Sequence, residues 1–133
     1  MQFLRLYLIS LVIFLILDFI WLSFIAKGFY QKELGPYLLD SFKLLPAIIF
    51  YLIFILGLNI FVISNSVSSS DPWLAIGLGA FFGFVTYATY DLTNLATLRF
   101  WTSTITIVDL VWGTVISSLT SFITYFINSK IWG

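Results

Sequence analysis

Long apolar runs separated by short polar segments dominate the chain. A helix needs about 20 apolar residues to cross the hydrocarbon of a bilayer, and four runs reach that length, at residues 3–26, 45–64, 72–98 and 103–128. Hydrocarbon offers no water to unpaired backbone groups, so each run must be helical. The pattern therefore predicts an all-α fold, a polytopic four-transmembrane-helix bundle, with residues 1–133 forming a single membrane domain.

The segments between these runs contain helix-ending and helix-starting signals. We interpret residues 27–44, which include three lysines and Glu33, as a solvated loop, and "NSVSSSDP" as a short flexible turn. Asp71-Pro72 predicts an N-cap followed by proline at the first helical position. Arg5 before an apolar run resembles a signal peptide. That run contains Asp18 and has bulky Phe24 where cleavage needs a small residue, so we expect a retained helix.

Four spans place segments 27–44 and 99–102 on one side of the membrane, named side B here. Both termini and the serine-rich linker then lie on the other, side A. Basic residues are more frequent on side B, with Lys27, Lys32, Lys43 and Arg99 there and Arg5 and Lys130 on side A. Cytoplasmic loops carry an excess of such residues. We therefore expect the loops 27–44 and 99–102 to be cytoplasmic.

Composition supports lipid as the solvent and removes several kinds of chemistry. Hydrophobic residues make up 61% of the chain and charged residues 9%, far from the balance of a soluble domain. Cysteine and histidine are absent, which excludes disulfides, thiol catalysis, Cys/His zinc sites and Ser-His-Asp chemistry. A net charge of zero gives no basic face for nucleic acid. No haem, nucleotide or zinc motif is present, so the cofactor stays unknown, with a divalent cation permitted.

Three aspartates lie inside the predicted spans. Asp18 falls in the second half of the first span, Asp91 near the end of the third and Asp109 in the first turns of the fourth. The fourth span runs antiparallel to the other two, so all three acids lie in the half of the membrane next to side B. A carboxylate at such a depth costs roughly 2.5–3.5 kcal/mol on insertion scales and normally has a partner or a task. We therefore expect a buried polar site.

The third span carries two polar stripes at its B end. At 100° per residue, one face of about 80° faces the bundle and holds Ala80, Gly83, Tyr87, Asp91 and Asn94. Small residues on such a face let a neighbouring helix come close. A second stripe, Thr86, Tyr90, Thr93 and Thr97, is a candidate contact with a second copy. We therefore expect a homodimer.

The fourth span has the cleanest pattern. Seven small or polar residues share a face of about 80° and should point into the bundle: Thr102, Thr106, Asp109, Gly113, Ser117, Thr120 and Thr124. In the first span a looser face holds Tyr7, Phe14, Asp18 and Trp21. The second span has Asn59 as its one strong internal polar group, and we assign that span to lipid contact and packing.

Each acid also has a purely structural explanation. Asp109 could bond Ser103 or Thr106 in its own helix, and Asp91 could pair with Arg99 across the short third loop. Asp18 could accept hydrogen bonds from Tyr or Trp donors on a neighbouring helix. Arg99 at the membrane surface suits a lipid phosphate or an anionic substrate, and equally a simple interfacial anchor.

Three functions fit these residues. The first is a membrane protein that binds a cation or small ligand and acts as a proton-coupled transporter, with a pocket built from Asp18, Trp21, Tyr87, Tyr90, Asp91, Asn94, Arg99, Thr106, Asp109 and Trp112. The second is an intramembrane enzyme acting on a lipid or lipid-linked substrate. It would use Asp91 and Asp109 as acid and base, or a divalent metal held by Asp18, Asp91 and Asp109 together with Asn94. The third is a structural or accessory subunit. The partners expected are the lipid bilayer, a second copy, and a small ligand, cation or lipid.

Several short motifs together resemble a known family. They are D-x-x-W-L at 18–22, F-Y at 29–30, Y-x-x-Y-D-L-T-N-x-A-T at 87–97 and D-x-x-W-G at 109–113. The chain is similar over nearly its whole length to the small bacterial membrane proteins of domain-of-unknown-function family 2177. The resemblance implies a four-helix protein of the bacterial inner membrane, and it implies no activity.

Overall fold

The computed structural model describes residues 1–37 and 43–133 as helices joined by short turns, without a strand in those ranges. In chain order they are α1 (Gln2–Ile20), a π-helical segment (Trp21–Ala26), α2 (Lys27–Leu34), a 3-10 turn (Gly35–Tyr37), α3 (Leu44–Leu58), a second π-helical segment (Asn59–Ile63), α4 (Ser64–Ser68), α5 (Pro72–Thr97) and α6 (Ser103–Ile131). Residues 38–42 of the predicted loop, and the side chain of Lys27, lie outside the described part.

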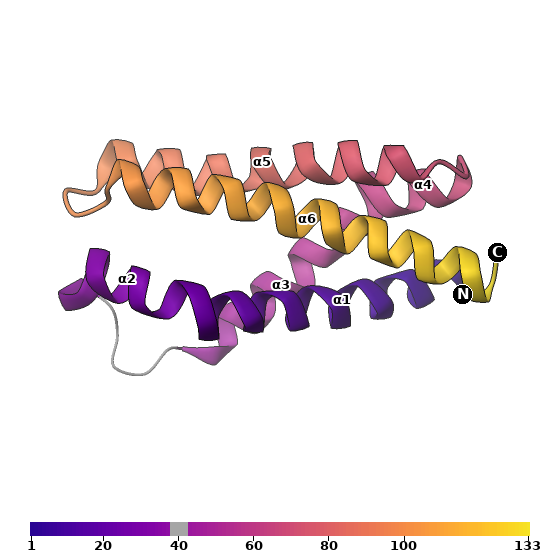
Figure 1. Cartoon of the computed structure of the whole chain (residues 1–133), viewed down its shortest axis with the longest axis horizontal. Coiled ribbons are helices and arrows are strands. Elements are labelled where there is room, and N and C mark those ends of the chain that lie inside the picture. The colour runs from indigo at the N-terminus through magenta and orange to yellow at the C-terminus, as the bar shows by residue number, and fades with distance from the viewer. Residues whose placement is uncertain (38–42) are drawn as a thin grey trace.

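Four continuous helical stretches are long and apolar enough to cross a membrane: Gln2–Ala26, Leu44–Ser68, Pro72–Thr97 and Ser103–Ile131. The predicted four-transmembrane-helix fold is confirmed. α5 and α6 run side by side along their whole length (Figure 1). Both termini lie at one end of the bundle, and α2 and the α5–α6 turn lie at the other, as the division into sides A and B requires.

Two segments predicted as loops are partly helical, and those predictions were wrong. The first helix continues through its π-helical segment into α2, because the apolar residues there find a surface on the start of α6. Leu34 is buried against Trp101 and Ile105, and Thr102 Oγ1 donates a 2.8 Å hydrogen bond to Glu33 Oε1. In the serine-rich linker, α4 extends the second span to Ser68 and leaves only a short turn before α5.

α5 and α6 approach closely because glycines and small residues face one another. A Cβ at Gly83 would overlap the carbonyl oxygen of Gly113, and one at Gly113 would overlap the ring of Tyr87. Gly79, rather than the predicted Ala80, is the next buried small residue on α5, with Ser117 and Ser121 opposite. As predicted, Asp71 caps α5, its Oδ1 accepting from the backbone N–H of Trp73 at 3.0 Å.

The polar face predicted for the fourth span is confirmed. α6 buries Thr106, Asp109, Gly113, Ser117, Thr120 and Thr124. Thr102 caps the helix, since its Oγ1 accepts a 3.1 Å hydrogen bond from the N–H of Ile105. The face packs largely against α5, and its A-side half also meets α1.

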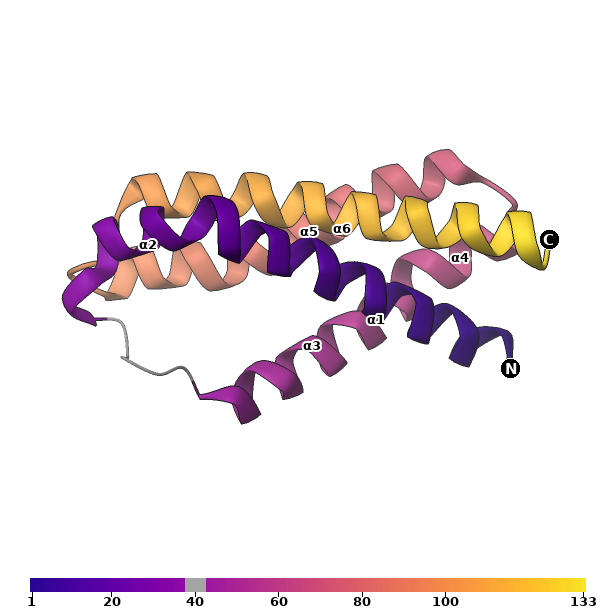
Figure 2. The same ribbon diagram turned by 60° about the horizontal axis from the view of Figure 1, so that its bottom comes forward.

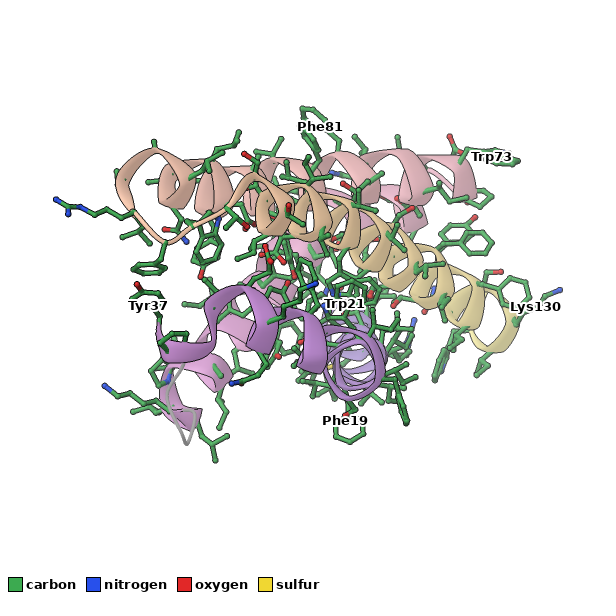
Figure 3. The ribbon with its side chains drawn as sticks, turned by 60° about the vertical axis from the view of Figure 1, so that its left-hand side comes forward. Phe19, Trp21, Tyr37, Trp73, Phe81 and Lys130 are labelled. Carbon is green, nitrogen blue, oxygen red and sulfur yellow. The ribbon has the colours of Figure 1, made fainter. Side chains whose placement is uncertain are left out.

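The apolar core lies where α1, α3 and α6 meet, and it includes Phe14, Ile55, Leu58 and Ile116. Many other large apolar side chains point outward, among them Phe19 and Phe81 at 67% and 65% exposure (Figure 3). An outer surface of this kind suits lipid. α3 crosses α1 and diverges from α5 and α6 toward its own N-terminus (Figure 2).

Candidate functional site

Asp18 joins three helices. The Tyr51 hydroxyl of α3 donates a hydrogen bond to its Oδ2, and the Trp112 Nε1–H of α6 donates to its Oδ1 over 3.4 Å. Trp112 is itself stacked on Trp21, with ring centroids 4.4 Å apart and planes 7° from parallel. The sequence had suggested that Asp18 could accept hydrogen bonds from Tyr or Trp on a neighbouring helix, and the structure contains both donors. They fix the position of the carboxylate.

Asp109 takes its partner from α2. The Tyr30 hydroxyl donates a hydrogen bond to Asp109 Oδ1, and Asp109 is 7% exposed. The bonds proposed within its own helix are not those observed. Thr106 Oγ1 donates instead to the carbonyl oxygen of Thr102 at 3.1 Å, and Ser103 is exposed.

Asp91 is fully buried, and neither of its carboxylate oxygens has a hydrogen-bond partner among the described residues. The predicted pairing with Arg99 is therefore wrong: Arg99 lies exposed in the turn after α5, because α5 ends two residues earlier. On α5, Gly83 and Tyr87 face α6 at Gly113. Continuing this antiparallel register by one turn brings Asp91 opposite the turn of α6 that carries Asp109.

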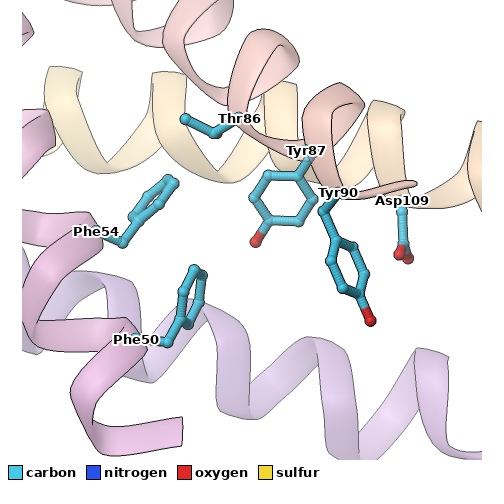
Figure 4. Close-up of a pocket in the computed structure, with 6 residues that line it drawn as sticks. All are labelled: Phe50, Phe54, Thr86, Tyr87, Tyr90 and Asp109. Carbon is cyan, nitrogen blue, oxygen red and sulfur yellow. The ribbon is translucent and has the colours of Figure 1, made fainter. Parts of the chain in front are cut away.

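A cavity of about 560 Å³ opens beside these acids, between α3, α5 and α6. Its lining residues, drawn in Figure 4, are Phe50, Phe54, Thr86, Tyr87, Tyr90 and Asp109. The Thr86 hydroxyl donates to the carbonyl oxygen of Phe82 at 2.8 Å, so that wall adds little polarity. The pocket therefore combines four aromatic rings with one carboxylate, at a size typical of small-molecule sites.

Residues 3–126 of the chain match the sequence model of a protein family that is described as "Predicted membrane protein (DUF2177)". The chain belongs to this family. No curated protein and no solved structure matches the chain. Every residue that lines the pocket falls inside the matched range.

The ten site residues predicted from the sequence fall into three groups according to their position relative to the pocket. Tyr87, Tyr90 and Asp109 line the pocket. Asp18, Trp21 and Trp112 form the adjoining cluster. The remaining four do not line it: Asp91 and Thr106 are buried, Asn94 is half-buried and Arg99 is exposed.

The structure also bears on the metal site and on the contact with a second copy that the sequence suggested. Across residues 1–37 and 43–133, no three His, Cys, Asp or Glu side chains gather as a metal site. In the stripe assigned to a second copy, Thr86 and Tyr90 line the pocket, whereas Thr93 and Thr97 are exposed. The homodimer stays a prediction.

Four residues of the site were not among the candidates identified from the sequence. Phe50, Tyr51 and Phe54 lie in the span that was assigned to lipid contact, and Tyr30 lies in the segment interpreted as a loop. One signal could have found Tyr51, whose hydroxyl is the single phenol in an otherwise apolar run and needs a partner there.

Proposed function

We propose that this protein binds a small organic cation, an ammonium group carrying an apolar or aromatic body, in the pocket between α3, α5 and α6. The observation that carries this proposal is the lining itself, in which Asp109 is the one carboxylate among the aromatic rings of Phe50, Phe54, Tyr87 and Tyr90.

Each part of such a ligand meets a matching surface. A cation over an aromatic face gains about 0.5–2 kcal/mol, most when desolvated, and the carboxylate of Asp109 supplies the opposite charge. Tyr30 occupies one oxygen of Asp109, and a carboxylate has roughly four acceptor sites, so it retains capacity for a ligand. The apolar body gains roughly 25 cal/mol for each Å² it removes from water.

Other ligand classes fit the lining less well. A hard metal ion prefers about six or more oxygen ligands, and the pocket offers one carboxylate with few other oxygens. An anion would be repelled by Asp109. Because basic residues are more frequent in the side B loops, we propose that side B is cytoplasmic and that the pocket lies in the cytoplasmic half of a bacterial inner membrane. The role that we propose for the protein is transport of the bound cation.

The test is calorimetric binding to the purified protein in lipid nanodiscs, with benzyltrimethylammonium as the probe. Its uncharged isostere, neopentylbenzene, has the same shape. Asp109→Asn should weaken binding of the cation by about tenfold or more, because it removes the Coulomb attraction of the opposite charge, which is about 4 kcal/mol at 4 Å for an effective dielectric constant of 20 before desolvation, and should leave the isostere unaffected. Asp71→Asn is the matched control, since asparagine also serves as an N-cap and Asp71 lies at the opposite end of α5.

A second variant guards against misfolding of the first. Tyr90→Leu removes an aromatic ring from the pocket lining at a side chain that is 58% exposed. It should lower the affinity for the cation by about 3- to 30-fold. Equal affinity of the parent protein for the cation and for its isostere would contradict the proposal. So would unchanged cation binding in both Asp109→Asn and Tyr90→Leu.

A further inference from the structure

The three buried acids of this protein have different surroundings. Asp18 accepts hydrogen bonds at both oxygens, from Tyr51 and Trp112. Asp109 accepts one from Tyr30 and borders the pocket. Asp91 is 0% exposed and has no donor for either oxygen among the described residues. Differences of this kind between neighbouring acids separate their roles.

An ionised carboxylate in the position of Asp91 would be strongly disfavoured, because a buried charge needs a counter-charge or several donors. A neutral carboxylic acid in the same place keeps its proton and avoids the cost of burying an unpaired charge. We propose that Asp91 is a proton-binding site, neutral while the pocket is empty, that gives up its proton when a cation occupies the pocket. The second half of this proposal rests on the proposed function.

The residues around Asp91 connect it to the pocket. Tyr87 and Tyr90 precede it by four and one positions on α5, and both line the cavity. Tyr87 faces Gly113 of α6 and packs edge-on against Phe54 of α3, with ring centroids 6.2 Å apart, and Tyr90 packs edge-on against Trp101 at 5.6 Å. A positive charge in the pocket would therefore be separated from the Asp91 carboxyl group by about one helical turn of α5, a distance at which charges still interact where water is excluded.

Among the described residues, the titratable groups that the neighbouring helices bring to the pocket and to the Asp18 cluster are acids and phenols. α6 contributes Asp109, α1 contributes Asp18 beyond Tyr87, α3 contributes Tyr51, and α2 contributes Tyr30, which is bonded to Asp109. None of these groups carries a positive charge that could balance an ionised Asp91, so Asp91 stays neutral until a cation enters. One proton then leaves Asp91 for the aqueous phase as one cation binds, so the net charge of the site is unchanged. This exchange is the coupling step that a proton-driven transporter needs.

Infrared spectroscopy of the full-length protein in nanodiscs tests the proton site without any ligand. A protonated carboxylic acid has a carbonyl stretching band that is distinct from the bands of a carboxylate. Near neutral pH the parent protein should show this band, Asp91→Asn should lose it, and the matched variants Asp18→Asn and Asp109→Asn should keep it. Absence of the band in the parent, or its persistence in Asp91→Asn, would overturn the proton site.

The exchange is tested by adding benzyltrimethylammonium in weakly buffered medium with a pH-indicator dye. We expect the acid band to fall and up to one proton to be released for each cation bound, with no release for neopentylbenzene. Binding of the cation with an unchanged band and no proton release would overturn the exchange. Failure of the cation to bind would refute the proposed function and the exchange with it, whereas the infrared band decides the proton site independently.

A second measurement covers the case in which Asp91→Asn does not fold. Labelling aspartate with ¹³C at the side-chain carboxyl of the parent protein should shift the acid band to lower frequency. An unshifted band would assign the proton to Glu33, to the carboxyl terminus or to lipid, and would overturn the proposal.

Discussion

Gly83→Ala tests how closely α5 and α6 have to approach for the site to form. The added Cβ would lie 2.7 Å from Ser117 Cβ and 2.5 Å from Ser117 Oγ, and would overlap the carbonyl oxygen of Gly113. Carbon atoms that are not bonded settle at about 3.5–4.0 Å. The two helices must therefore separate locally by about 1 Å, since the backbone oxygen cannot turn away.

Overpacking of this kind costs about 1–3 kcal/mol, and contact with backbone favours the upper end. Alanine also gains about 1 kcal/mol over glycine in helix propensity, which would hide part of the cost. Gly77→Ala on the same helix is the matched control, because its Cβ meets nothing within 4 Å. The free energy of unfolding of Gly83→Ala should fall below that of Gly77→Ala by about 1–3 kcal/mol.

The assay is equilibrium unfolding in mixed lipid–detergent micelles, followed by tryptophan fluorescence and by far-ultraviolet circular dichroism. Tyr87 and Asp91 continue the stripe of Gly83, so the affinity for benzyltrimethylammonium should fall together with stability. Equal free energies of unfolding for the two alanine variants would refute the close α5–α6 contact, and with it the register that places Asp91 opposite Asp109.

Two further predictions concern the cluster around Asp18. Tyr51→Phe removes one donor to the carboxylate and should destabilise the protein by about 1.5–3 kcal/mol; in a double-mutant cycle with Asp18→Asn most of this loss should disappear, and additive losses would argue against the bond. The stacked pair Trp21 and Trp112, 4.4 Å apart, should give a paired near-ultraviolet circular dichroism signal that Trp112→Phe abolishes. Trp73→Phe, at a site 77% exposed, should leave that signal intact, and its survival in Trp112→Phe would exclude the stack.

Sequence periodicity was sufficient for the four membrane spans and for the polar face of the fourth, but not for the helical parts of the segments between them. The polar stripe of the fourth span, from Thr106 to Thr124, is buried along its length in α6, because a face defined by 100° per residue depends only on the helix that carries it. The concentration of the acids near side B follows in the same way from alternating helix directions. Neither inference needs knowledge of how the helices cross.

The partners of the acids depend on crossing and were not predictable in this way. Tyr51 reaches Asp18 because α3 crosses α1 at that level, and no pattern within the second span states that. Arg99 was paired with Asp91 on proximity in sequence, but α5 ends before it and the turn directs it outward. A short separation along the chain does not determine direction at a helix end.

The π-helical segment Trp21–Ala26 sets which way Tyr30 points. A regular α-helix turns by about 100° per residue, and a π-helical turn holds one residue more, so everything beyond it is rotated relative to α1. The direction in which Tyr30 points, toward Asp109, therefore depends more on the number of residues in this segment than on their identity. Exchanging the exposed side chains there, such as Leu22 and Phe24, would leave the phenol in place, whereas deleting a single residue would rotate it by about 100° and leave Asp109 without its donor.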